Sequence, residues 1–218
     1  NSVNYPLGAY YRVEPKSIED MHCAINDLGI LYASAVCHAG WDELKKSTHH
    51  PYKEIPNTKV NLVVADRDCY ALERAENHQI PHQLIKRGKD FSENLEKLLP
   101  ENTDLIVLAG FLSILSKEFC EKYNGKIINI HPALLPKFGG KGMWGHYVHE
   151  AVIAAQEKES GATVHYVTSG IDEGEIILQG KFEIAENETP ETLAQKVHQI
   201  EYEIFPKAID LVLNKRVP

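Results

Sequence analysis

The sequence predicts an α/β fold, a doubly wound and mostly parallel sheet of Rossmann-like form with an antiparallel hairpin near the C-terminus. Two observations predict it. From residue 53 onward, short apolar runs alternate with amphipathic runs of helical length, which is typical of a parallel sheet with right-handed crossovers. Nearer the C-terminus, two runs of strand composition flank the Gly-containing turn 169–174, which indicates a hairpin added to that sheet.

Length, charge and cysteine content narrow the class of protein. A chain of 218 residues can build one substantial core, and its net charge of −8 comes from scattered acidic residues. Nucleic-acid-binding proteins carry a clustered basic face, so no nucleic-acid partner is expected. Four widely spaced cysteines favour free thiols over disulfides or a metal site. No run approaches the ~20 apolar residues of a membrane span, and the start lacks a signal-peptide pattern, so we expect a soluble, cytoplasmic protein.

The first part of the predicted sheet alternates regularly between strands and helices. The run 104–109 is almost continuously apolar, which is typical of a strand covered on both faces. Ser116 has the position of a helix N-cap. In order, we expect strand 59–65, helix 69–77, strand 80–85, helix 90–99, strand 104–109, a helix from Ser116 to Lys122, and strand 126–130.

The second part begins with a glycine-rich loop, 139–145, that has the composition of a ligand-covering flap. We then expect helix 147–157, strand 163–168, the turn, and strand 176–184. The last helix opens at Thr189 with Pro190 at its first position, and a core-facing stripe follows from Leu193 to Ile204. Pro206 is expected to kink this helix or split it.

Asn129 and His131 stand out at the end of strand 126–130. Strand side chains alternate between faces, so these two project from the same face. The carboxyl end of such a strand is where open α/β sheets bind ligands. The alternative is a buried strand that runs into an ordinary loop stiffened by Pro132 and Pro136.

Asp172, in the turn 169–174, supplies a carboxylate that reaches His131 if the hairpin packs beside the Asn129 strand. A carboxylate orients a histidine ring, and an amide donor stabilises an oxyanion. No Ser or Cys accompanies the motif as a nucleophile. The residues therefore indicate direct acyl transfer or hydrolysis, with His131 moving the proton.

Two separated motifs resemble the signatures of folate-dependent formyltransferases. The first is Asn-Ile-His-Pro-Ala-Leu-Leu-Pro at 129–136, followed by Gly139-Gly140. The second runs from Gly161 to Val167 and on into 171–177. Both match in order and spacing, and the similarity extends from about residue 53 to the C-terminus. It is greatest to the members that act on glycinamide ribonucleotide in purine synthesis.

The resemblance implies the Rossmann-like formyltransferase fold and an enzyme that transfers a formyl group. The donor would be 10-formyltetrahydrofolate, a co-substrate, and the acceptor would be the amine of glycinamide ribonucleotide. On this basis Asn129 would donate to the oxyanion and His131 would handle the proton. Asp172 would hold His131 and an ordered water.

Two binding regions are also implied by the resemblance. The folate head would be read by the backbone of Phe111, Leu112, Ser113, Ile114 and Leu115, with Ile127 lining the same pocket. The family often has Met-Arg where this chain has Leu112-Ser113, a modest departure because these contacts are largely main-chain. The ribonucleotide would be bordered by Gly140, Lys141, Gly142 and Glu201, the last placed for the ribose hydroxyls. The alternative for Glu201 is an exposed carboxylate on a helix.

The first 52 residues depart from the family pattern. Members begin with a strand that ends in a loop of the form G-x-G-[ST]-N, whose backbone amides bind the substrate phosphate. The nearest analogue here is 30–39, with an expected strand at 30–36, but Val36 and Cys37 replace glycines that admit positive φ. Short helices are expected at 17–28 and 41–46.

We therefore divide the chain into a divergent segment, 1–52, which is foreign or replaces the first βα unit, and a formyltransferase domain, 53–218. Three functions stay open. They are the formyltransferase of glycinamide ribonucleotide, a 10-formyltetrahydrofolate hydrolase or formyltransferase of another amine, and a fusion that binds folate without turnover.

Overall fold

The computed structural model describes residues 31–33, 60–68, 70–77, 79–101 and 103–214. The expected helices 17–28 and 41–46 and the expected phosphate-loop analogue beyond residue 33 lie outside these ranges. Within them the strands are β1 (Leu31–Ala33), β2 (Val63–Ala65), β3 (His82–Leu84), β4 (Ile106–Leu108), β5 (Ile127–His131), β6 (Glu159–Tyr166) and β7 (Ile176–Glu183). The helices are α2 (Tyr70–Asn77), α3 (Phe91–Leu98), α4 (Lys117–Lys122), α5 (His146–Ala154) and α6 (Pro190–Leu213).

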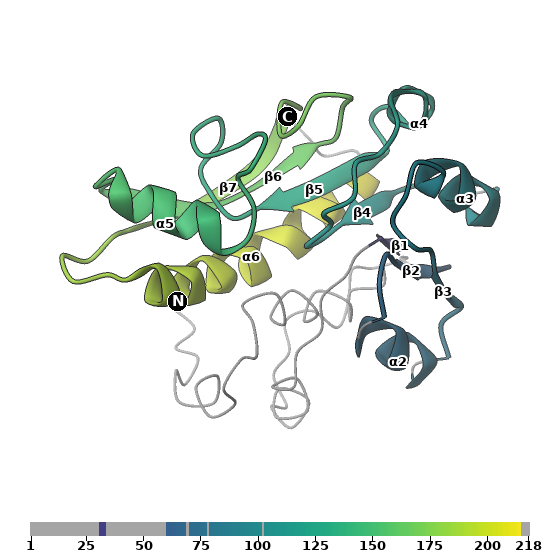
Figure 1. The fold of residues 1–218 in the computed structure, drawn as a ribbon, viewed down its shortest axis with the longest axis horizontal. Helices are drawn as coiled ribbons and strands as arrows, with labels where there is room; N and C mark the ends of the chain where they lie inside the picture. The colour runs from purple at the N-terminus through teal and green to yellow at the C-terminus, as the bar shows by residue number, and fades with distance from the viewer. Residues whose placement is uncertain (1–30, 34–59, 69, 78, 102, 215–218) are drawn as a thin grey trace.

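The strands of the described residues form one sheet in the order β3-β2-β1-β4-β5-β6-β7 (Figure 1). The pairs from β3 to β5 are parallel, whereas β6 is antiparallel to β5 and β7 is antiparallel to β6. The predicted fold class is confirmed: a mostly parallel α/β sheet carries a C-terminal antiparallel hairpin.

β1 occupies the centre of the parallel part. Tyr32 pairs with Val63 of β2 on one side and with Val107 of β4 on the other. The part of the expected strand 30–36 that the structure describes is therefore a strand, inserted between the strands that follow it in sequence. The division at residues 52 and 53 stays a prediction.

Helices cover both faces of the sheet because its strands alternate apolar side chains between two hydrophobic clusters. Ile127 packs with Phe91 of α3 and Phe119 of α4 on one face. Ile128 packs on the other face, in the cluster that includes residues of α2, α5 and α6. Figure 1 shows α6 running along the hairpin strands and beside α5. Asn129 and His131 share the face of Ile127.

Several boundaries differ from the predicted ones. β2 and β4 are shorter than the apolar runs that contain them. Leu62 and Leu105 are buried like the strand residues but lie outside the hydrogen-bonded strands. β6 starts four residues before the predicted Thr163, since Glu159 to Ala162 pair with β7. α6 continues through Pro206 and is not split, whereas the predicted Ser116 cap of α4 is confirmed by the N–H that Phe119 donates to its Oγ.

Candidate active site

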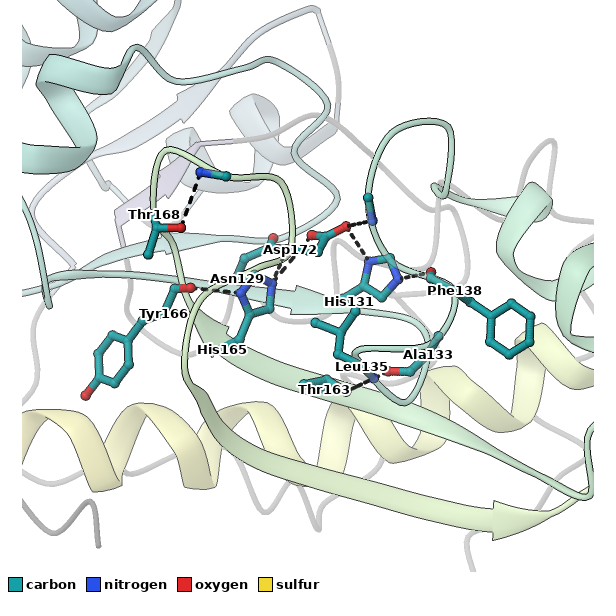
Figure 2. A network of polar contacts seen from close by, with 12 residues as sticks. Asn129, His131, Ala133, Leu135, Phe138, Thr163, His165, Tyr166, Thr168 and Asp172 are labelled. Atoms are coloured by element: carbon teal, nitrogen blue, oxygen red, sulfur yellow. Dashed lines mark hydrogen bonds and ion pairs between the residues drawn. The ribbon is translucent and has the colours of Figure 1, made fainter.

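The register of β5 places Asn129 and His131, two of the three candidate catalytic side chains. This strand lies between β4 and β6, and its register sets Asn129 opposite His165 and His131 opposite Thr163. Figure 2 shows Asn129 and His131 on the same face of the strand, with the carboxylate of Asp172 between their ends. The structure thus brings together the three side chains that the sequence predicted to act together.

His131 is held at both ring nitrogens. Its Nε2 donates to the carbonyl of Phe138 at 2.7 Å, and its Nδ1 lies 3.5 Å from Oδ2 of Asp172. The imidazole is 5% exposed. Since the carbonyl requires a proton on Nε2, neutral His131 carries its lone pair on Nδ1. A proton taken up there lies against the carboxylate, which stabilises the charged ring.

Asp172 is fixed by the glycine-rich flap. The N–H of Gly140 donates to its Oδ2 at 2.9 Å. Asp172 itself has φ of 58°, in the left-handed region that Asp and Asn tolerate better than most residues. A Cβ on Gly139 would lie 2.5 Å from a methyl carbon of Leu135 and 3.3 Å from the Cβ of Asp172, so the flap packs closely against both side chains.

His165 is a site residue that the sequence reasoning did not single out. Its Nδ1 donates to the carbonyl of Tyr166 at 2.8 Å, and its Nε2 lies 3.2 Å from Nδ2 of Asn129. Burial lowers the pKa of His165 below its ordinary 6.5, although the Tyr166 carbonyl and Asp172 act in the opposite direction. Neutral His165 therefore accepts one N–H of Asn129, which leaves the second N–H of that amide for another acceptor.

A signal for His165 was present in the sequence. It lies in the second family motif, on the strand next to β5, at the position that antiparallel pairing sets opposite Asn129. The register of β6 on β5 could not be predicted from the sequence.

Thr163 fixes the turn that follows His131. Its hydroxyl donates to the carbonyl of Ala133 at 2.6 Å and accepts from the N–H of Leu135 at 3.0 Å and from Nε2 of Gln179 at 2.8 Å. The side chain is fully buried. The backbone leaving β5 is thereby tied to β6 directly beside the histidine.

Asn129, His131, His165 and Asp172 border a cavity of about 290 Å³. The predicted folate segment and the predicted ribonucleotide segment both line it. Its walls include Phe111, Leu112, Ser113, Ile114, Leu115, Asn129, His131, Gly140, Lys141, Gly142, Trp144, His165 and Asp172.

Two predicted binding residues do not line this cavity. Ile127 is fully buried in the cluster with Phe119. Glu201 is also fully buried, on α6, with Oε2 2.7 Å from Nδ1 of His198. The alternative interpretation of Glu201 as an exposed helix carboxylate is therefore wrong. Contact of Ile127 with folate, and of Glu201 with ribose, stays a prediction.

The arrangement favours direct transfer over a covalent enzyme intermediate. Among the described residues, no Ser or Cys hydrogen-bonds to His131, whose partners are Phe138 and Asp172. Cys120 lines the cavity, but burial raises the pKa of its thiol and so disfavours the nucleophilic thiolate. A proton acceptor and an amide donor then remain, which suits attack by an external amine or water.

The described part of the chain holds no group of three His, Cys, Asp or Glu side chains that could bind a metal ion. Within the same residues, no helix has the length and apolar character that a membrane span requires.

Comparison with known proteins places the site in context. Residues 33–209 match the formyl transferase family. The phosphoribosylglycinamide formyltransferase of Haemophilus influenzae is 38% identical over 164 residues, which cover 72% of this chain and 74% of that protein. The trifunctional purine biosynthetic protein adenosine-3 of Bos taurus is 39% identical over 163 residues, covering 72% of this chain but only 16% of that protein.

Solved structures show the same fold. The phosphoribosylglycinamide formyltransferase from Anaplasma phagocytophilum superposes with a TM-score of 0.69 at 30% identity, over 86% of this chain and 88% of that one. A formyltetrahydrofolate deformylase from Pseudomonas syringae reaches a TM-score of 0.70 at 24% identity, over 86% and 61% of the two chains, which is a likeness of fold.

Proposed function

Because the chain belongs to the formyl transferase family, we propose that it transfers a formyl group from 10-formyltetrahydrofolate to the amine of glycinamide ribonucleotide. The observation that carries the proposal is the group Asn129, His131 and Asp172, joined at the wall of one cavity in the family fold. Relatives named for this activity match most of the chain, one over 72% of its length and a solved structure over 86%.

Each of these residues has a chemical task in such a transfer. The amine attacks the formyl carbon, a new C–N bond forms, and the bond to the folate nitrogen breaks. The free N–H of Asn129 stabilises the charge that develops on the formyl oxygen. His131 accepts the proton that the amine loses and returns it to the departing folate nitrogen, while Asp172 stabilises the charged imidazole in between.

The cavity fits the two substrates in different places. Segment 110–115 offers apolar side chains and backbone for a flat heterocycle, with Phe111 braced by the ring of Phe91 at 5.5 Å. At the other wall, Lys141 is exposed and has no ionic partner among the described residues, which suits an anionic phosphate. Gly140 and Gly142, with φ of 89° and 88°, let the backbone there approach a ligand closely.

A formylation assay tests this function against the two alternatives. Wild-type protein with 10-formyltetrahydrofolate is expected to formylate glycinamide ribonucleotide, and to leave the folate intact when water is the only acceptor. Release of formate without an amine would instead establish the hydrolase, and formylation of an amino sugar alone would establish a different acceptor.

Calorimetry with a 10-formyl folate analogue identifies the remaining alternative. Binding without turnover of any acceptor would show a fusion that retains only the folate site. An absence of binding would overturn the folate assignment itself, whatever the acceptor.

A further inference from the structure

The segment 110–115 forms one wall of the cavity but belongs to neither a helix nor a strand. Among the described residues, no backbone-to-backbone hydrogen bond outside the helices and strands involves residues 111–115. Its far end is anchored where the N–H of Ser116 donates to Oγ of Ser92 at 2.8 Å. Side-chain contacts hold this wall, among them the packing of Phe111 against Phe91 and the burial of Leu115 in the cluster with Phe119.

Asp66 supplies such a contact. It follows β2 directly, and its carboxylate is fully buried. Ser113 donates from Oγ to its Oδ2 at 2.8 Å. Because β1 lies between β2 and β4 in the sheet, this bond spans the carboxyl end of β1 and joins two loops at the ligand-binding edge.

The carboxylate is itself held in place by a cation. Arg87, which follows β3, donates from Nε to Oδ2 at 2.7 Å and from Nη2 to Oδ1 at 3.3 Å. A paired guanidinium offsets the cost of burying the carboxylate and fixes its plane. Ser113 therefore binds an acceptor that is charged, rigid and shielded from water. Hydrogen bonds to such groups are stronger than those between neutral partners.

We propose that Asp66 is a positioning residue for the folate-binding wall. Through Ser113 it holds segment 110–115 in the shape that receives the heterocycle, and it does so without touching the ligand, since its side chain is not exposed to the cavity. The inference rests on the proposed function only for the identity of the ligand. The bond between Ser113 and Asp66 itself involves only residues of this chain.

Two variants weaken the hydrogen bond between Ser113 and Asp66, one at the acceptor and one at the donor. Asp66→Asn keeps the shape but removes the charge that binds Arg87, and Ser113→Ala removes the donor. In ligand-free protein, both are expected to speed amide hydrogen exchange in 110–115, and to leave exchange in β5 and β6 unchanged. The 10-formyl folate analogue is expected to bind about tenfold more weakly to each, the scale of one charge-assisted hydrogen bond.

The kinetic readout separates positioning from general destabilisation. In Asp66→Asn, KM for the folate should rise, whereas kcat and KM for glycinamide ribonucleotide should stay as in wild type. In Ser113→Ala, whose side chain borders the cavity, KM for the folate should rise as well. Ile209→Val, a cavity-forming change in the fully buried core of α6, is the matched control. It should lower the melting temperature and leave folate affinity unchanged.

The double variant Asp66→Asn with Ser113→Ala completes a cycle. If the two residues act through one bond, its loss of folate affinity should be smaller than the product of the two single losses. If Asp66→Asn fails to fold, Ser113→Ala alone tests the proposal. Faster amide hydrogen exchange in 110–115 and weaker binding of the folate analogue in Ser113→Ala would support the positioning role. Wild-type exchange and affinity in that variant would overturn it.

The result also separates this inference from the proposed function. If wild type binds the folate analogue and both variants bind it equally well, the positioning role is wrong and the folate assignment stands. If wild type does not bind it, the folate assignment fails. Unchanged hydrogen exchange in the variants then overturns the tie independently.

Discussion

The two walls of the cavity are held in place by different means. At the wall formed by β5 and β6, backbone register sets Asn129 opposite His165, and Asn129 and His131 both stand on a paired strand. The wall formed by 110–115 has no such ladder, and a side-chain bond from Ser113 to Asp66 joins it to the neighbouring loop. A single substitution on β5 leaves the backbone ladder in place, whereas a single substitution at Ser113 or Asp66 removes the side-chain bond between the two loops.

The largest effect that this comparison predicts is on catalysis at the register-held wall. His131→Ala should lower kcat by roughly a thousandfold, because it removes the group that moves the proton. The affinity of the folate analogue should be unchanged, since β5 keeps its ladder. Steady-state kinetics and calorimetry on the same preparation measure both.

His146→Ala is the matched control for this change. His146 lies on α5 and does not line the cavity, and its Nε2 is 2.9 Å from Oε1 of Glu150. The kcat of the His146→Ala variant should equal that of wild type. A His131→Ala variant that retained wild-type kcat would show that the site has been assigned to the wrong histidine.

A smaller effect is expected from the hydroxyl that ties β5 to β6. Thr163→Val preserves shape but leaves the N–H of Leu135 and the carbonyl of Ala133 without their buried partner. We expect a loss of about 1–3 kcal/mol in the free energy of unfolding, measured by urea titration. kcat should also fall, because the turn after His131 loosens, while folate affinity holds.

Thr103→Val provides the comparison. Its hydroxyl donates to the carbonyl of Pro100 in a half-buried turn that precedes β4, and it does not line the cavity. Thr103→Val should lower the free energy of unfolding by less than Thr163→Val does, and it should leave kcat unchanged. Equal losses of unfolding free energy in the two variants would show that the buried hydroxyl of Thr163 stabilises its turn no more than the half-buried hydroxyl of Thr103 does.

The register-held wall is also the part that the sequence predicted best. Alternation along one strand placed Asn129 and His131 together, and a turn flanked by glycines marked Asp172. Such signals are local, so no knowledge of strand order was needed. The fold class followed for the same reason, from the alternation of strand and helix patterns.

The contacts that sequence reasoning missed depend on strand order and register. Asp66 and Ser113 are 47 positions apart, and their side chains meet across the end of β1, which lies between the strands that precede them. His165 faces Asn129 only in one register of β6 on β5. The start of β6 was missed because Gly161 carries no strand signal, although it packs so tightly on Gly180 that a Cβ would lie 1.9 Å from its carbonyl oxygen.

The smallest predicted effect is on the pH dependence of stability and comes from His165. Burial lowers its pKa in the folded protein, so below the ordinary value of 6.5 the unfolded chain binds a proton that the folded chain does not. The stability from this group is therefore fully present above 6.5 and is lost as the pH falls through the lowered pKa. His165→Gln, which has no titrating ring, should show a shallower loss of unfolding free energy in that acid range. Urea titrations across the range measure the difference in slope, and equal slopes for the two proteins would show that His165 takes up its proton in the folded and unfolded states alike.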